Sequence, residues 1–308
     1  MKTLVTGGAG FIGSNIVAEL VQQGHEVVVL DNLSSGYRSN LDPFSTVSID
    51  EGDIRDAALL ERLMDDVEVV FHLAASVGNK RSIDNPIEDS DVNVMGTLRV
   101  LEAARHAHVR KVVFSSSAGI FGELKTLPIL EDHPAEPDSP YGASKLAAEK
   151  LCLVYAKIYP LECICLRYFN VYGINQRYDA YGNVIPIFAH RLLQGQEVVV
   201  FGDGEQTRDF VNVRDVVQAN YRAALTRGVS GAFNVASGTR ISINRLAKML
   251  SALSGGQAEM DYAPPRPGDV RHSLADISAA RAAFGYEPTV GLDEGLSEYM
   301  TWARTELK

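Results

Sequence analysis

Tyr141 and Lys145 have the residue types and the spacing of an acid–base pair in the segment SPYGASKLAAEK. On a helix, residues four apart lie on one face, so the phenol and the ammonium group come close together. A free tyrosine titrates at about pH 10, and a neighbouring positive charge lowers that pKa toward neutrality. The pair therefore predicts a phenol that takes a proton from a substrate hydroxyl. The alternative is an ordinary surface contact, which most pairs with this spacing make.

A serine-rich segment, SSSAGIFG, comes after the apolar run KVVF and offers a second group for the same chemistry. The apolar run predicts a strand, and strand ends in a parallel sheet face the ligand crevice. Ser117 is expected there to hydrogen-bond the same hydroxyl as Tyr141, with Ser116 as the competing choice. The alternative is a polar loop of turn-forming serines.

Gly7, Gly10 and Gly13 form a glycine-rich turn between an apolar run and a helical pattern. Gly7 permits a tight turn, Gly10 lets the backbone approach a pyrophosphate, and Gly13 lets the helix pack closely. The start of the helix offers free N–H groups and the positive end of its dipole. This context predicts a dinucleotide site, and the alternative is a strand-to-helix turn that merely needs small residues.

Two aspartates come after the next apolar runs. Asp31 ends EVVVLD, where a carboxylate can accept both ribose hydroxyls of an adenosine. It would repel the 2′-phosphate of NADP, so NAD is the predicted cofactor. Asp53, in GDIRD, either meets the adenine or caps the helix that contains ALLERL.

The elements that position these residues are predicted from the apolar pattern. Strand runs at 2–7, 26–31, 67–73, 111–115 and 162–170 alternate with helical patterns over 11–23, 89–106 and 141–158. This alternation predicts an α/β fold with a Rossmann-type doubly wound parallel sheet and right-handed crossovers. We assign residues 1–170 to the NAD-binding domain. Residues 171–308 are expected to form mainly a smaller, loop-rich α/β substrate domain with helices near 213–227, 242–254 and 291–306, and a strand and helix around 209–236 returning to the first domain.

Composition excludes several partners. The formal net charge is −10 over 308 residues, and an acidic surface repels nucleic acid and anionic membranes. No stretch of about 18 apolar residues exists, so no membrane span is expected, and the first residues enter the glycine turn instead of forming a secretory signal. Cys152, Cys163 and Cys165 lack metal-ligand spacing. We expect buried thiols, no metal centre and a reducing cytoplasm.

The motifs occur together in one order along the chain: TGGAGFIG, Asp31, GDIRD, HLAA, SSSAGIFG, Tyr141-x-x-x-Lys145 and RYFNVYG. In this order the chain resembles the extended short-chain dehydrogenase/reductase family, specifically the nucleotide-sugar epimerases, over essentially all of its length. The resemblance implies a Ser117–Tyr141–Lys145 triad around the sugar and an NAD that stays bound through turnover. The cofactor contacts that it implies are Gly7, Gly10, Phe11, Ile12, Gly13, Asp31, Asn32, Asp53, Ile54, Leu73, Ala74, Ala75, Asn93, Tyr141, Lys145 and Tyr168.

The resemblance also implies how the second half holds a nucleoside diphosphate. Asn170, Arg208 and Arg266 match residues that hold the pyrophosphate and the uridine ribose, and arginine forks suit phosphate oxygens. Asp269 matches a ribose-binding carboxylate. Val184 and Ile185 begin the segment that lies against uracil. Without the resemblance, each arginine alone is better interpreted as a surface salt bridge.

The two residues after Ser117 distinguish between the reactions of the family. Family members that eliminate water carry an Asp-Glu pair after the active-site Thr, and the decarboxylases carry a Glu there. This chain has Ala118 and Gly119, and neither can serve as an acid or base. We therefore predict 4-epimerisation through a 4-keto sugar. The alternatives are a UDP-glucuronate epimerase or another nucleotide-sugar reductase or oxidoreductase; an NAD-sensing regulator on the same fold would be expected to lack the Tyr or the Lys.

Sugar identity depends on Ser273, which lies seven residues past Arg266. In the family a bulky Tyr at that position narrows the sugar pocket against an N-acetyl group, and a serine leaves room. We therefore expect UDP-GlcNAc and UDP-GalNAc as substrates alongside UDP-glucose and UDP-galactose. Arg81 either contacts an acidic sugar or is a solvated loop residue. In the family the helices near 89–106 and 141–158 pair across subunits as a four-helix bundle, so the resemblance also implies a homodimer.

Overall fold

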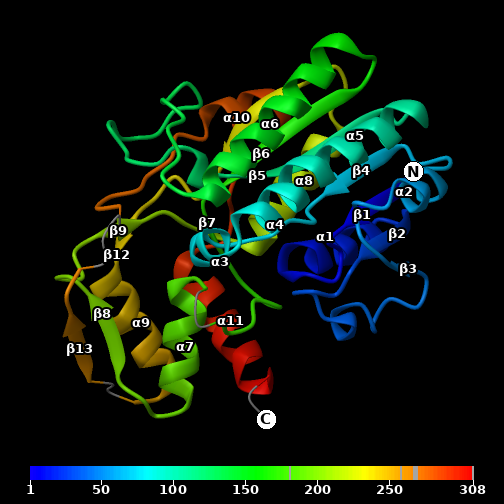
Figure 1. Ribbon diagram of the computed structural model, residues 1–308. Coiled ribbons are helices and arrows are strands. Elements are labelled where there is room, and N and C mark those ends of the chain that lie inside the picture. Colours follow the sequence, from blue (N-terminus) through cyan, green and yellow to red (C-terminus); the bar gives the residue numbers. More distant parts are fainter. Residues whose placement is uncertain (180–181, 257–258, 266–269, 307–308) are drawn as a thin grey trace.

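A seven-stranded parallel sheet with the strand order β3-β2-β1-β4-β5-β6-β11 is the largest element (Figure 1). The computed structural model describes residues 1–179, 182–256, 259–265 and 270–306. The strands of the sheet are β1 (Lys2–Thr6), β2 (Glu26–Asp31), β3 (Ser48–Glu51), β4 (Val69–His72), β5 (Lys111–Ser117), β6 (Glu162–Tyr168) and β11 (Gly231–Val235). The predicted Rossmann-type doubly wound sheet is confirmed.

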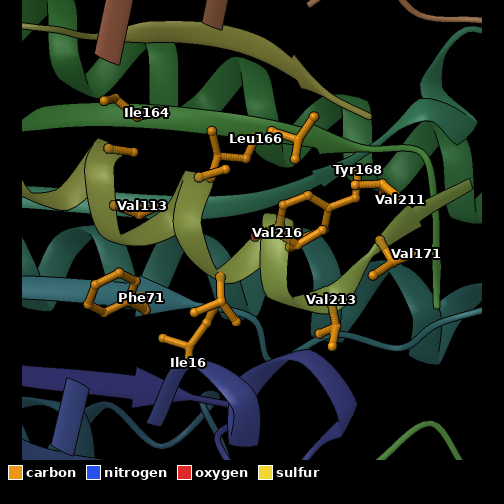
Figure 2. Close-up of a cluster of buried hydrophobic side chains, with 14 of the residues drawn as sticks. Ile16, Phe71, Val113, Ile164, Leu166, Tyr168, Val171, Val211, Val213 and Val216 are labelled. Atoms are coloured by element: carbon orange, nitrogen blue, oxygen red, sulfur yellow. The ribbon is translucent and has the colours of Figure 1, made fainter. Parts of the chain in front are cut away.

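Both faces of this sheet are buried, which explains why its strands are almost continuously apolar. Val5 and Phe71 belong to one core, and Leu4 and Val70 belong to the other, because side chains alternate along a strand. Figure 2 shows the first core, with Ile16 and Val216 from helices packed against the strand residues Phe71, Val113, Ile164 and Leu166.

Helices cover the two faces in the doubly wound manner. The first face is covered by α1 (Phe11–Gln22), α8 (Val213–Leu225) and α10 (Ser278–Phe284). The second face is covered by α2 (Ala57–Leu63), α5 (Thr97–His106) and α6 (Pro140–Ile158). The helices predicted at 11–23 and 141–158 are therefore confirmed.

The helix predicted over 89–106 is confirmed, but it starts at Pro86, contains a π-helical segment and follows a separate short helix. The chain forms α3 (Asn79–Asp84), α4 (Pro86–Ser90), a wider π-helical segment η2 (Asp91–Gly96) and then α5. The Thr97 hydroxyl donates to the carbonyl of Asn93, 2.6 Å away, inside this wider segment. Such π segments cluster at functional sites, and this one carries Asn93, a predicted cofactor residue.

The later part of the chain has a core of its own beside the sheet (Figure 1). Its elements are α7 (Val184–Leu193), α9 (Ile243–Ser254), α11 (Leu292–Glu306) and the parallel pair β8 (Val198–Phe201) with β13 (Met260–Ala263). Two short pairs complete it, β7 (Asn170–Tyr172) with β10 (Phe210–Asn212) and β9 (Thr207–Arg208) with β12 (Ile241–Ser242). The helices predicted near 213–227, 242–254 and 291–306 are confirmed, and β11 and α8 lie with the large sheet.

All three cysteines are buried free thiols. Cys163 and Cys165 lie on the same face of β6, as their spacing predicts. Among the helices of the described ranges, none combines the length and the apolar character needed to cross a membrane.

Candidate active site

The glycine turn joins β1 to α1, and its three glycines have different roles. Gly7 has φ +71°, and a Cβ there would lie 2.7 Å from the amide nitrogen of Ala74. A Cβ on Gly13 would lie 2.1 Å from the carbonyl oxygen of Gly7. A Cβ on Gly10 would meet only that same oxygen, at 3.2 Å. Gly7 and Gly13 are thus required by the fold itself, whereas the space beside Gly10 is open.

That open space lies at the start of α1. The helix begins at Phe11 after Gly10, and no side chain caps its first turn. Uncapped amides and the positive end of the helix dipole favour a phosphate group. The turn therefore fits the pyrophosphate of a dinucleotide, and contacts of Gly10, Phe11 and Ile12 with the cofactor stay predictions.

Asp31 is largely buried at the end of β2, the strand beside β1. Its carboxylate accepts hydrogen bonds from the amides of Ala9 (2.9 Å) and Leu33 (2.8 Å). These bonds hold it against the glycine turn, and its remaining lone pairs are available as acceptors. This placement suits the ribose contact that the sequence predicts.

Asp53 does not cap a helix. The N-cap of α2 is Asp56, whose side chain accepts from the amide of Leu59. Asp53 instead binds the guanidinium of Arg55, which holds the pKa of its carboxyl below the usual value, and it accepts from Asn32 at 3.2 Å. The capping alternative is therefore wrong, because α2 starts three residues later than that interpretation requires; the adenine contact stays a prediction. Ile54, next in the chain, is buried in the core.

The loop after β4 carries Leu73, Ala74 and Ala75 and is held by a buried histidine. His72 Nδ1 lies 2.7 Å from the hydroxyl of Thr6, which also accepts from the amide of Ala74 at 3.2 Å. Burial lowers the pKa of His72 to about 3, so the ring is neutral at physiological pH. The HLAA motif thus places the Ala74 amide directly against Gly7.

Asn93 locks the far side of the same loop. Its amide oxygen accepts from the Ser76 amide (2.8 Å), and its amide nitrogen donates to the carbonyl of Ser76 and to the side chains of Asp89 and Ser144. The Ser144 hydroxyl also donates to Asp89 at 2.5 Å. Ser144 precedes Lys145, so these bonds join the cofactor loop to α6; the direct cofactor contact of Asn93 stays a prediction.

The predicted triad comes together at the carboxyl end of β5. Ser139 caps α6 by accepting from the amide of Gly142, and Pro140 begins the helix, so Tyr141 and Lys145 lie in its first two turns. A Cβ on Gly119 would lie 3.3 Å from the Ser117 hydroxyl oxygen and 3.6 Å from the ring of Tyr141, so the two side chains are close neighbours; the Ser117 hydroxyl also accepts from the amide of Gly119 at 3.1 Å. The Lys145 ammonium lies 4.3 Å from the centre of the Phe114 ring.

The structure separates the two candidate serines. Ser116 donates to the buried carboxylate of Glu149 at 2.6 Å, whereas the hydroxyl of Ser117 lies beside the ring of Tyr141. Neighbouring strand residues face opposite sides, so one serine belongs to the packing behind the site and the other to the site.

Burial dominates the titration of both catalytic candidates. Loss of hydration raises the pKa of the Tyr141 phenol, the hydrogen bond with Ser117 lowers it, and the charge of Asp89 raises it further. Burial lowers the pKa of Lys145 to about 8. In the protein without a bound cofactor, desolvation of the phenolate outweighs the nearby charges, and lowering of the tyrosine pKa by Lys145 stays a prediction. Activation of Tyr141 as a base requires a further positive charge in the site.

The substrate half brings several predicted residues together around Asp209. The Asn170 amide donates to the backbone oxygen of Asp209 at 3.0 Å, and Arg208 precedes it on β9. The Asp209 carboxylate itself is buried and accepts from Ser237, Gly238 and Ala275. Asp209 is not among the site residues that the sequence predicts; its only signal is that it is an acid next to a predicted phosphate-binding arginine.

Ser273 lies beside the same strand. Its amide donates to the carbonyl of Thr207 at 3.0 Å, and its side chain is largely buried. Val184 begins α7 and is partly exposed, whereas the side chain of Ile185 packs into the later core. Any contact of Ile185 with a base would therefore involve its backbone. Arg266 and Asp269 lie outside the described residues.

Two further residues have partners that the sequence did not indicate. Tyr168 points into the core (Figure 2), where its hydroxyl bonds the side chain of Asn220. Its predicted cofactor contact therefore cannot use the hydroxyl without breaking this bond. Arg81, on α3, forms an exposed ion pair with Asp179 at 3.4 Å.

These two halves of the site define a class of protein: a Rossmann-fold protein with a dinucleotide turn after β1 and, at the carboxyl end of β5, a Ser-Tyr-Lys set of which the lysine is buried. The chain belongs to the NAD dependent epimerase/dehydratase family, which matches residues 3–236. It is 43% identical to a UDP-glucose 4-epimerase of Mycolicibacterium smegmatis, with 99% of both chains covered. Its structure is similar to that of the Thermotoga maritima UDP-glucose 4-epimerase with UDP-glucose, with TM-score 0.95, 40% identity and full coverage of both chains.

A second solved structure bears on the choice of sugar. The UDP-N-acetylglucosamine 4-epimerase of Methanobrevibacter ruminantium, in complex with UDP-N-acetylmuramic acid, is 37% identical and has a TM-score of 0.95. The comparison covers 99% of this chain and 98% of that one. Relatives of both sugar types thus share this fold at similar identity.

Proposed function

We propose that this protein is an NAD-dependent 4-epimerase that interconverts UDP-glucose with UDP-galactose and UDP-GlcNAc with UDP-GalNAc. The observation that carries the proposal is the placement of Ser117 beside Tyr141 at the carboxyl end of β5, within a family of NAD-dependent enzymes. Ala118 and Gly119, the next residues after Ser117, form a short turn and offer no acid for elimination or decarboxylation.

Each residue of the triad has a separate role in this reaction. A bound NAD, held at the glycine turn, would supply the hydride acceptor and donor for C4 of the sugar. Tyr141 takes the proton of O4 as the carbonyl forms, and gives it back when the hydride returns to the opposite face. Ser117 holds the same oxygen by a hydrogen bond. Lys145, protonated at neutral pH because its pKa is about 8, supplies positive charge beside the phenol.

Substrate breadth depends on Ser273. The largely buried side chain is small, and it lies on the segment that pairs with β9 near Arg208. We infer that it leaves room for an N-acetyl group at C2 of the sugar. The chain is 40–43% identical to two relatives named for UDP-glucose and 37% identical to one named for UDP-N-acetylglucosamine, so sequence identity supports both substrates.

The first measurement is incubation with UDP-GlcNAc without added NAD, followed by chromatographic separation of the UDP-sugars. We expect UDP-GalNAc to form, because the cofactor is retained and no net redox change occurs. Ser273→Tyr is expected to lower this turnover by about 100-fold and to spare conversion of UDP-galactose, while the control Ser273→Ala keeps both.

Several outcomes would contradict the proposal. No turnover of UDP-GlcNAc beside active conversion of UDP-galactose would reject the open pocket and keep the epimerase. Inactivity on both sugars, even with NAD supplied, would reject the 4-epimerase. Consumption of NADH in proportion to product would favour a reductase, and conversion of UDP-glucuronate alone would favour an epimerase of acidic sugars.

We also propose that the protein is a homodimer in which α5 and α6 pair with their copies. Large apolar side chains stay exposed on this part of the molecule: Ile87 on α4, Met95 on η2, and Val154 and Ile158 on α6. Val154→Asp is expected to yield monomers in sedimentation experiments, because a charge cannot be buried there without a partner. Leu225→Asp, an equally exposed position on α8, is the control and should leave the dimer intact. A monomeric wild-type protein would contradict the proposal.

A further inference from the structure

Glu149 is a fully buried carboxylate that the proposed reaction does not use. It lies on α6 one turn after Lys145 and two turns after Tyr141, on the side of the helix that packs against the sheet. A buried charge is costly unless it is paired and hydrogen-bonded. Its partners therefore show what it holds together.

Those partners come from the two strands beneath α6. Arg167, on β6, donates from Nη2 to one carboxylate oxygen (2.7 Å) and from Nε to the other (3.0 Å). Ser116, on β5, donates to the second oxygen at 2.6 Å. Ser116 and Arg167 are also direct partners in the β5–β6 ladder, so one carboxylate binds both strands at the same level.

The cluster reaches beyond these three residues. Arg167 Nη1 donates to the backbone carbonyl of Glu131 at 2.7 Å, and the guanidinium stacks over Phe121 at 5.2 Å. The Glu131 side chain accepts from the amide of Asn234 on β11. The arginine fork is thus satisfied on both sides, which fixes its orientation.

We propose that Glu149 is a positioning residue: held by Arg167 and Ser116, it fixes α6 against β5 so that Tyr141 stays in contact with Ser117. Ser116 is the chain neighbour of Ser117, and Glu149 lies on the helix that carries Tyr141. The cluster therefore sets the distance between Ser117 and Tyr141. Misplacement of a reacting group by about 1 Å can lower a rate by about 100-fold. The inference rests on the proposed function, because it concerns the triad of that reaction.

A stabilising role alone does not explain the pair. Replacement of a buried ion pair by apolar residues of similar size is often neutral for folding or even stabilises it. The same replacement would, however, remove the hydrogen bonds that join α6 to the ends of β5 and β6. Stability and turnover are therefore expected to separate in this protein.

Glu149 also acts on the site through charge. Burial lowers the pKa of Lys145, and the negative charges of Asp89 and, to a smaller extent, Glu149 raise it. Without Glu149, we expect Lys145 to lose its proton at a slightly lower pH. If loss of that proton limits kcat at high pH, the alkaline decline of kcat should then move to slightly lower pH.

Two variants test the inference on the full-length enzyme. Ser116→Ala removes the link to β5 and leaves the ion pair intact, and we expect kcat to fall about 10-fold with KM unchanged. The triple variant Ser116→Ala, Glu149→Met, Arg167→Met removes the whole anchor without an unpaired charge. We expect it to melt within a few degrees of wild type, to lose about 100-fold in kcat, and to show the alkaline shift.

Glu102→Gln is the matched control. Glu102 likewise accepts a two-pronged bond from an arginine, Arg105, and a bond from a hydroxyl, Tyr155, but it lies on α5 and is partly exposed. It should change neither kcat nor the pH profile. A crystal structure of the triple variant supplies a readout that is independent of turnover: the contact between Ser117 and Tyr141 should be broken.

A triple variant with wild-type kcat and an intact Ser117–Tyr141 contact would overturn the inference. The same holds if kcat falls only in proportion to lost stability, with no change in the pH profile. Failure of the wild-type enzyme to convert any UDP-hexose would contradict the proposed function instead. In that case the position of Tyr141 relative to Ser117, compared between the wild-type and triple-variant structures, would still test this inference.

Discussion

Replacement of Tyr141 by phenylalanine is expected to lower kcat by about 10²–10⁴-fold, the usual contribution of a general acid–base group. The phenol is partly buried beside Ser117, and its removal leaves no other group at that position to take the proton. The ring of phenylalanine fills the same volume, and the loss of one hydrogen bond costs about 1 kcal/mol. Folding and NAD content should therefore stay close to wild type.

The matched control is Tyr155→Phe on the same helix. Its hydroxyl also donates a hydrogen bond, to Glu102 at 2.5 Å, but it lies on the side of α6 that faces α5. Turnover of UDP-galactose, bound NAD per subunit and the melting temperature would be measured for both variants. Equal kcat in the two variants would show that Tyr141 is not the base. Loss of NAD together with activity in Tyr141→Phe would assign the residue to cofactor binding alone.

Gly13→Ala is expected to remove both stable folding and the cofactor. The new methyl group would lie 2.1 Å from the carbonyl oxygen of Gly7 and 2.8 Å from the Cα of Gly8. These are backbone atoms, so α1 has to move away from β1, and overpacking of this kind costs about 1–3 kcal/mol or more. The displaced helix start would no longer point its amides at a pyrophosphate.

Gly10→Ala separates binding from folding at the same turn. A methyl group there meets one atom, the carbonyl oxygen of Gly7, at 3.2 Å, which a shift of a few tenths of an ångström relieves, so we expect a melting temperature only slightly below that of wild type. NAD should nevertheless be lost, because the methyl group occupies the space next to the uncapped start of α1. Gly256→Ala, with no atom within 4 Å of the new methyl group, is the control for glycine replacement itself. Retention of NAD by Gly10→Ala would place the pyrophosphate elsewhere.

Local pattern was enough for much of the fold. Apolar runs such as EVVVLD are strands because both faces of the sheet are buried, and this signal needs no knowledge of the partners. The glycine turn was predictable because its steric demands act within a few residues of the chain. The wider π-helical turn at Asn93 was not, because it depends on bonds from Asn93 to Ser76 and Ser144.

Spacing along single strands and helices was sufficient to predict the parallel sheet, the dinucleotide turn and the pair Tyr141–Lys145. The choice between Ser116 and Ser117, the rejection of Asp53 as a helix cap and the bond from the Tyr168 hydroxyl to Asn220 required the folded chain. The partnership of Glu149 with Arg167 also became visible only there. These outcomes depend on which groups meet across β5, β6 and α6. Such contacts join residues far apart in the chain, and their geometry is set only when the layers pack.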